Sequence, residues 1–188
     1  MKITKRLIII VLFAILLIIL FRVLKVQNLL LKKLYPTNYQ EYVEECSKEF
    51  GIDKLLIYSI IKAESNFEEN ANSKSGAKGL MQIMDSTAED IANNLGIDEQ
   101  RSYNLYDAQT NIRFGTKYFS DLLSEYNNNE KLALAAYNAG KGNVNKWIEQ
   151  GKINKDGSNI ENIPFKETNM YVRKILQNYR IYNELNNM

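Results

Sequence analysis

The hydrophobic and polar positions of the chain follow two different patterns. Residues 7–21 are apolar without a break, whereas from Tyr39 onward apolar residues recur every three to four positions. The second spacing is typical of helices that bury one face. No alternation of apolar and polar residues is long enough to predict a sizeable sheet. The pattern therefore predicts a mainly α-helical single domain, with helices near residues 39–50, 54–64, 86–95, 107–126, 132–137, 144–148 and 165–182.

The N-terminal apolar stretch predicts a transmembrane helix. If Arg22 and Lys25 reach the interface, the stretch extends to residue 26 and has the roughly 20 residues needed to cross a bilayer. Basic residues before it also suit a cleaved signal peptide, but no small-residue cleavage pattern follows Phe21. We therefore favour an uncleaved signal anchor at residues 7–26.

The anchor divides the chain into four parts. A short cytoplasmic N-terminus at residues 1–6 precedes the anchor, a stalk follows at residues 27–37, and residues 38–188 form the domain. Basic residues flank the apolar stretch on both sides, so the charges alone do not fix its orientation in the membrane.

Composition narrows the chemistry of the domain. Seven basic residues precede residue 34, which leaves 17 basic and 22 acidic residues for the remainder. We expect no nucleic acid partner, because phosphate binding needs a basic face. The chain has no histidine, which excludes Ser-His-Asp and Cys-His catalysis and zinc sites of the HExxH type. Cys46 is the only cysteine, so no internal disulfide can form, and we expect it to be a small buried hydrophobe.

Glu64 ends the most continuously apolar helix of the domain. This helix begins after Asp53, a residue type that caps helices, and residues 55–63 are apolar on most sides. Burial and the negative end of the helix dipole both raise the pKa of a carboxyl at such a position. A carboxyl that stays protonated near neutral pH can act as a general acid. The alternative is that Glu64 only marks where the helix reaches solvent.

Four sequence blocks point to one family. The residues at positions 64–84 read ESNFEENANSKSGAKGLMQIM, and further blocks are NIRFG at 111–115, AYNAG at 136–140 and IPF at 163–165, followed by ET and YV. In this order, over roughly residues 38–184, they resemble the transglycosylase SLT domain, the catalytic domain of lytic transglycosylase family 1. The chain has Asp85 and Lys141 where the family often has proline, which leaves the backbone open at these two positions.

This resemblance implies a fold and a reaction. The fold would be lysozyme-like, of the goose type. Enzymes of the family cut the β-1,4 bond between N-acetylmuramic acid and N-acetylglucosamine in peptidoglycan without hydrolysis. The acetamido group of the substrate and then its 6-hydroxyl act as nucleophiles, which leaves a 1,6-anhydro sugar end. One carboxyl, here Glu64, would act first as acid and then as base, with no metal and no cofactor.

The resemblance also implies substrate-binding residues in the segment after Glu64. Gln82 carries amide donors and an acceptor suited to sugar groups, Gly79 permits close approach of the backbone, and Met81 offers an apolar wall. Ser73 falls at the serine that positions the acetamido group. Ser65 directly follows the acid.

Three later residues complete the expected site. Tyr137 can stack on a sugar ring or bond to it, and Tyr171 matches the tyrosine that lies close to the catalytic acid. Asn138 would tie down a helix end. Each tyrosine has the alternative role of a core aromatic with a satisfied hydroxyl.

Three interpretations of the function remain open. We favour a peptidoglycan lytic transglycosylase, anchored in the cell membrane by a single pass, with its catalytic domain outside the cytoplasm. A lysozyme-type muramidase, which hydrolyses the same bond, is the alternative enzyme. A non-catalytic peptidoglycan-binding module of a secretion or conjugation system is the alternative of another class. The sequence does not identify a protein partner.

Overall fold

The computed structural model describes residues 2–97 and 103–187, and in the first helix it describes the side chains from residue 13 onward, apart from residues 14, 23, 24 and 28. Contacts divide the chain into two units. One comprises residues 37–183, and the other contains the first helix, so each unit is described by itself.

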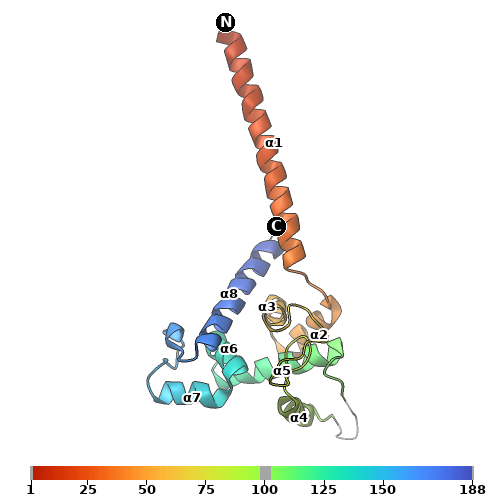
Figure 1. Ribbon diagram of the computed structural model, residues 1–188, viewed down its shortest axis with the longest axis vertical. Helices are drawn as coiled ribbons and strands as arrows, with labels where there is room; N and C mark the ends of the chain where they lie inside the picture. Colours follow the sequence, from red (N-terminus) through yellow and green to blue (C-terminus); the bar gives the residue numbers. More distant parts are fainter. Residues whose placement is uncertain (1, 98–102, 188) are drawn as a thin grey trace. The chain divides into compact units, whose positions relative to one another are not determined.

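Helix α1 spans Lys2–Leu34 (Figure 1). The predicted stalk at residues 27–37 is therefore helical as far as Leu34. Among the described residues, no helix combines the length and the apolar character that a membrane crossing requires. The predicted anchor at residues 7–26 lies partly outside the residues whose side chains are described.

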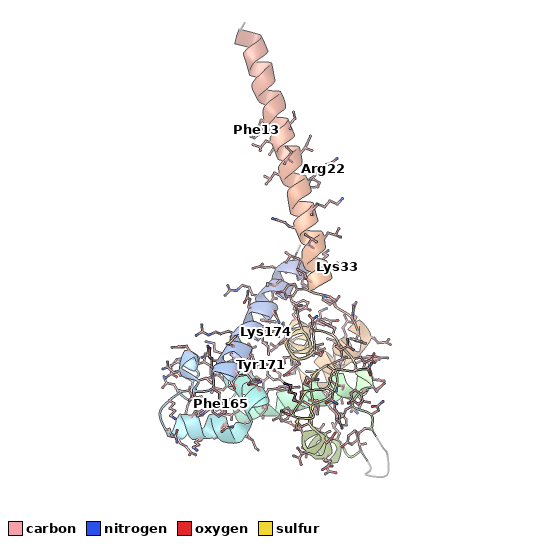
Figure 2. The ribbon with its side chains drawn as sticks, viewed as in Figure 1. Phe13, Arg22, Lys33, Phe165, Tyr171 and Lys174 are labelled. Atoms are coloured by element: carbon pink, nitrogen blue, oxygen red, sulfur yellow. The ribbon has the colours of Figure 1, made fainter. Side chains whose placement is uncertain are left out.

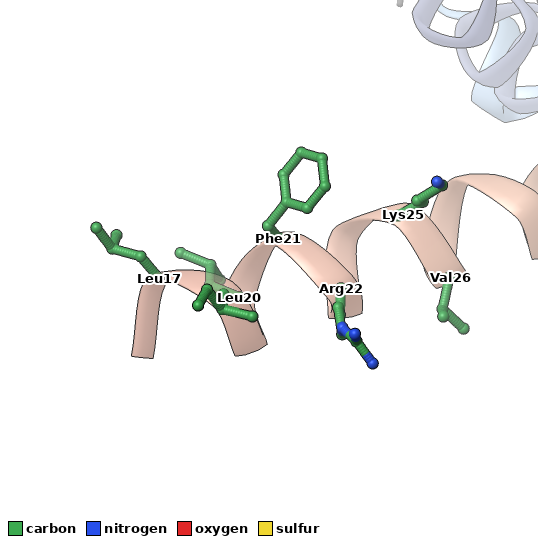
Figure 3. A pocket seen from close by; sticks show the side chains of 7 residues that line it. Leu17, Leu20, Phe21, Arg22, Lys25 and Val26 are labelled. Atoms are coloured by element: carbon green, nitrogen blue, oxygen red, sulfur yellow. The ribbon is translucent and has the colours of Figure 1, made fainter. Parts of the chain in front are cut away.

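A shallow hollow runs along α1 and is made by this helix alone. Figure 3 shows it from close by, with the side chains of one helical stretch around it. Its lining residues are Leu17, Ile18, Leu20, Phe21, Arg22, Lys25 and Val26.

The domain is built from helices, as predicted. Within its described residues, the only β-structure is a pair of isolated bridges, from Asn72 to Lys78 and from Lys78 to Ile83. Figure 1 shows α5 in the middle of the domain, and this helix contacts α2, α4 and α6. The helices are α2 (Gln40–Phe50), α3 (Lys54–Glu64), α4 (Asp85–Asn94), α5 (Ala108–Glu125), α6 (Glu130–Ala139), α7 (Lys141–Glu149) and α8 (Lys166–Asn186), with a short 3-10 helix η1 (Ile160–Asn162).

Capping residues fix the helix ends close to their predicted positions. The Asp53 carboxylate accepts a hydrogen bond from the Leu55 N–H (2.8 Å) at the start of α3. Asp107 does the same for the Thr110 N–H (2.8 Å) at the start of α5. Helix α6 begins two residues earlier than predicted, because Asn129 caps it. These caps satisfy N–H groups that the first turn of a helix leaves free.

Candidate active site

Glu64 is the last residue of α3, and α8 supplies its closest partner. The Tyr171 hydroxyl donates a hydrogen bond to Glu64 Oε1 at 2.6 Å, across 107 positions of sequence. The other carboxylate oxygen has no hydrogen bond within the described part of the chain, so it is free to meet a ligand. Seven consecutive residues of α3, Leu55–Ile61, are buried before the half-buried Glu64.

The surroundings of Glu64 raise its pKa, as the sequence predicted. Burial raises the pKa of the carboxyl from 4.5 to about 7, while the hydrogen bond from Tyr171 and the charge of Lys174 lower it. Burial therefore outweighs both stabilising contacts. At neutral pH the acid and the carboxylate forms of Glu64 are both populated.

Helix α8 runs antiparallel to α3, because residues further along α8 contact residues earlier in α3. After Tyr171, the Lys174 ammonium donates to the Ala63 carbonyl at 2.7 Å and the Asn178 amide donates to the Ser59 carbonyl at 3.4 Å. These three α8 residues recur at helical spacing and so lie on one face. Figure 2 labels Tyr171 and Lys174 on α8.

The segment after Glu64 folds back against α5 through one buried asparagine. The Asn111 carbonyl accepts a hydrogen bond from the Met81 N–H (2.7 Å), and its amide donates to the carbonyls of Lys78 (2.9 Å) and Leu105 (2.7 Å). Asn111 is 1% exposed. From the other side, the Ser65 hydroxyl donates to the Leu80 carbonyl at 2.8 Å. Ser65 and Asn111 thus hold the 65–84 loop at the end of α3.

Gly79 and Met81 lie on the inner side of this loop. A Cβ at Gly79 would lie 2.3 Å from the Asn111 amide nitrogen, and the φ of 75° also favours glycine, so the close approach is to α5. Met81 is fully buried, and a Cβ on Gly115 would lie 2.5 Å from its sulfur. The Met81 side chain therefore packs in the core, where the sequence had predicted a substrate-facing wall.

Gln82 and Ser73 also bond to the loop itself. The Gln82 amide donates to the carbonyls of Gly79 (2.9 Å) and Ala71 (3.3 Å), which leaves its side-chain carbonyl for other partners. Ser73 is exposed and its hydroxyl oxygen accepts from the Ala77 N–H at 2.9 Å. The described contacts do not join Ser73 to Glu64.

Helix α6 brings Tyr137 close to Glu64 and is tied to α8 by Asn138. The Tyr137 hydroxyl donates to the Met81 carbonyl at 2.8 Å. Burial, followed by the charge of Glu64, raises the pKa of both Tyr137 and Tyr171, which puts both rings near the acid. The Thr168 hydroxyl donates to the Asn138 side-chain oxygen at 2.8 Å, so Asn138 ties α6 to α8.

Tyr118 of α5 packs against one of these tyrosines. Its ring lies 5.1 Å from that of Tyr137, measured between centroids. Tyr118 also lines a groove of about 620 Å³ whose other walls come from α4, α5 and the start of α7. This tyrosine therefore connects the surroundings of Glu64 with an open groove.

The described acids that follow Glu64 most closely in the sequence interact with groups other than Glu64. Burial, then Glu69 and Glu68, raise the pKa of Tyr39, so these two acids lie at the start of the domain. Asp85 pairs with Lys78 at 2.7 Å. Among described residues, no acid contributes to the pKa of Glu64, and no group of three or more cysteines and acids could hold a metal ion.

Comparisons with known proteins agree on one family. Residues 41–160 match the Transglycosylase SLT domain. A putative soluble lytic murein transglycosylase of Haemophilus influenzae is 36% identical over 143 residues, which cover 75% of this chain and 24% of that protein. Membrane-bound lytic murein transglycosylase C of Photorhabdus laumondii is 36% identical over 124 residues, which cover 61% of this chain and 34% of that protein.

A solved structure has the same fold. The structure of an inactive mutant of the lytic transglycosylase Slt from Pseudomonas aeruginosa matches with a TM-score of 0.73 and 35% sequence identity, over 81% of this chain and 25% of that one. The chain thus spans about a quarter of the length of the first relatives it matches. Its helical domain has the lysozyme-like SLT fold, and the chain belongs to the Transglycosylase SLT domain family.

Proposed function

We propose that this protein is a membrane-anchored lytic transglycosylase that cleaves the β-1,4 bond between MurNAc and GlcNAc in peptidoglycan, outside the membrane. One observation carries the proposal: a single carboxyl has a pKa near neutrality, is bonded on one oxygen by Tyr171 and is free on the other. That arrangement suits one group that must give a proton and later take one back.

In the first step, the Glu64 carboxyl protonates the bridging oxygen. The bond between that oxygen and C1 of MurNAc breaks, and the electron pair leaves with the GlcNAc. The acetamido oxygen of MurNAc attacks C1, in the place that a second carboxylate takes in most glycosidases. The Tyr171 hydroxyl, bonded to Oε1, stabilises the carboxylate that remains.

In the second step, the Glu64 carboxylate takes the proton of the MurNAc 6-hydroxyl. The O6 atom attacks C1 and displaces the acetamido oxygen. This closes the 1,6-anhydro ring and returns Glu64 to its acid form. Atoms balance without water, which distinguishes the reaction from hydrolysis.

The other expected residues divide between binding and support. In this proposal the Gln82 side-chain carbonyl and the rings of Tyr137 and Tyr171 meet the sugar. Ser65, Gly79, Met81 and Asn138 hold the loop and helix ends around it, in keeping with their contacts inside the domain. The exposed Ser73 would contact the acetamido group only if the substrate extends along the loop.

The relatives support the activity, and the N-terminal sequence supports the location. The matched proteins are named lytic murein transglycosylases, and the name of one includes "membrane-bound". The apolar residues 7–21 suit a signal anchor that would hold the domain at the outer face of the cell membrane.

Digestion of purified peptidoglycan tests the proposal. The full chain should release fragments with anhydro ends, which mass spectrometry separates from reducing ends because they are lighter by one water. Glu64→Gln should abolish release, while Glu68→Gln, which removes an exposed acid, should not. Reducing ends would instead favour the muramidase. Binding to peptidoglycan without cleavage, equal in wild type and Glu64→Gln, would favour the non-catalytic module.

A further inference from the structure

Lys174 reaches the end of α3 at the residue before the catalytic acid. It lies three positions after Tyr171, on the same face of α8. Its ammonium donates to the Ala63 carbonyl at 2.7 Å, one of the carbonyls that the last turn of a helix leaves without an internal partner. One face of α8 thus delivers a hydroxyl to the carboxyl of Glu64 and a cation to the neighbouring peptide.

The groups around Glu64 come from three helices besides its own. Tyr171 and Lys174 come from α8 and Tyr137 comes from α6, with Tyr118 of α5 behind it. These tyrosines are neutral at working pH, because burial raises the pKa of each. On α3 itself, the Lys62 ammonium donates to the Asn66 side chain at 3.1 Å, and burial and then the charge of Lys174 lower the pKa of Lys62. The charge of Lys174 lowers the pKa of Glu64.

The placement of Lys174 matters because it makes no direct salt bridge. A cation bonded to the carboxylate itself would lower the carboxyl pKa by roughly 1 to 3 units and favour the ionised form. A cation bonded to the neighbouring peptide lowers the carboxyl pKa less. The hydrogen bond to the Ala63 carbonyl holds the Lys174 ammonium in this position. The exposed Lys174 also offsets the negative end of the α3 dipole.

We propose that Lys174 is a positioning residue of the proposed reaction: it fixes the end of α3 and keeps the carboxylate form of Glu64 accessible for the second proton transfer. This inference rests on the proposed function. Glu64 must pass through both protonation states in each turnover, whereas burial and the helix end both favour the neutral state. Without a nearby cation, the carboxylate that accepts the proton of the 6-hydroxyl would be harder to form.

Substitutions at Lys174 separate its charge from its hydrogen bond. Lys174→Arg keeps both, Lys174→Gln keeps a donor without the charge, and Lys174→Met removes both. Arg173→Met is the matched control, since Arg173 is an exposed cation on the same helix that bonds to Asn169 (2.8 Å). Peptidoglycan release by the full chain is measured against pH for each variant.

The inference predicts a shift of the pH profile. In Lys174→Gln and Lys174→Met, the limb where activity falls with rising pH should move up by about 0.5 to 1 unit, because the pKa of Glu64 rises when the cation is lost. Lys174→Met should also lose rate at the optimum, whereas Lys174→Arg and Arg173→Met should follow the wild type. An unmoved limb in both charge-removing variants, even with a lower rate, would overturn the inference.

A second readout does not need activity. Titration of the Glu64 carboxyl by ¹³C NMR should show the same upward shift in Lys174→Gln and none in Arg173→Met. If the wild type releases no anhydro ends, the proposed function fails, while the titration still decides whether Lys174 acts on Glu64. Equal titration curves in all variants would refute the role of Lys174.

Discussion

The two sides of Glu64 are held in different ways. On one side, α8 contacts the end of α3 with a hydroxyl and an ammonium that both act on the charge of the acid. On the other side, α5 holds the 65–84 loop through Asn111, whose three hydrogen bonds go to backbone groups. We infer that changes on the α8 side alter titration of the acid, whereas changes on the α5 side alter stability.

Glu64→Gln removes the group that both sides surround, and it has the largest expected effect. In the proposed reaction Glu64 is both the general acid and the general base, so its loss should lower peptidoglycan cleavage by at least about 100-fold. Release of soluble fragments measures this. Cleavage within a few-fold of the wild type would place the chemistry elsewhere.

Asn111→Ala tests the α5 side. It leaves the Met81 N–H and the Leu105 carbonyl without partners, while the Lys78 carbonyl keeps its bond from the Ile83 N–H. The free energy of unfolding should therefore fall by about 3 to 5 kcal/mol, measured by urea denaturation. Asn143→Ala is the control: it removes a single hydrogen bond from the half-buried Asn143 of α7 to the Ala139 carbonyl and should cost about 1 kcal/mol. If a folded Asn111→Ala protein has a shifted pH profile of activity, the α5 side also affects the titration of Glu64, which would contradict the comparison.

The raised pKa of Glu64 predicts how stability varies with pH. The folded chain holds this proton up to about pH 7, whereas the unfolded chain releases it near 4.5, so the free energy of unfolding falls as the pH rises between these values. Glu64→Gln does not titrate there. The free energy of unfolding of Glu64→Gln, relative to that of the wild type, should therefore rise by roughly 3 kcal/mol between about pH 4 and about pH 8. A constant difference across this range would mean that Glu64 has the same pKa in the folded and the unfolded chain.

Tyr171→Phe tests the α8 side and has the smallest expected effect. Loss of the donor to Oε1 should raise the pKa of Glu64 further, moving the limb of falling activity up by about one unit and lowering the rate by about tenfold. Tyr179→Phe is the control on the same helix, because the Tyr179 hydroxyl donates to Asp53 at the far end of α3 (2.6 Å). Tyr179→Phe should leave the pH profile in place, and a shift as large as that of Tyr171→Phe would point to a general loosening of α8.

The sequence predicted the parts of the fold that depend on local signals. The caps Asp53 and Asp107 and the continuous apolar run before Glu64 are local, and the structure has helix ends at or next to the predicted residues. The raised pKa of Glu64 followed from the same run, since burial is its largest cause.

Residues whose roles depend on long-range contacts were harder to predict. Lys174 follows Arg173 in a helix and looks like part of a solvated face, yet its partner lies 111 positions away. Asn111 sits in a helix of mixed polarity, and only the fold buries it. Met81 was expected to face the substrate. The sequence does not show that Gly115 leaves space in the core for the Met81 side chain.

Titration of the Glu64 carboxyl in the wild-type chain tests the account most directly. Selective ¹³C labelling of glutamate, with the signal assigned by its loss in Glu64→Gln, gives the pKa of this one group. The account predicts a pKa of about 7. A value near the ordinary 4.5 would show that the acid is ionised at neutral pH and would contradict its role as the single proton donor.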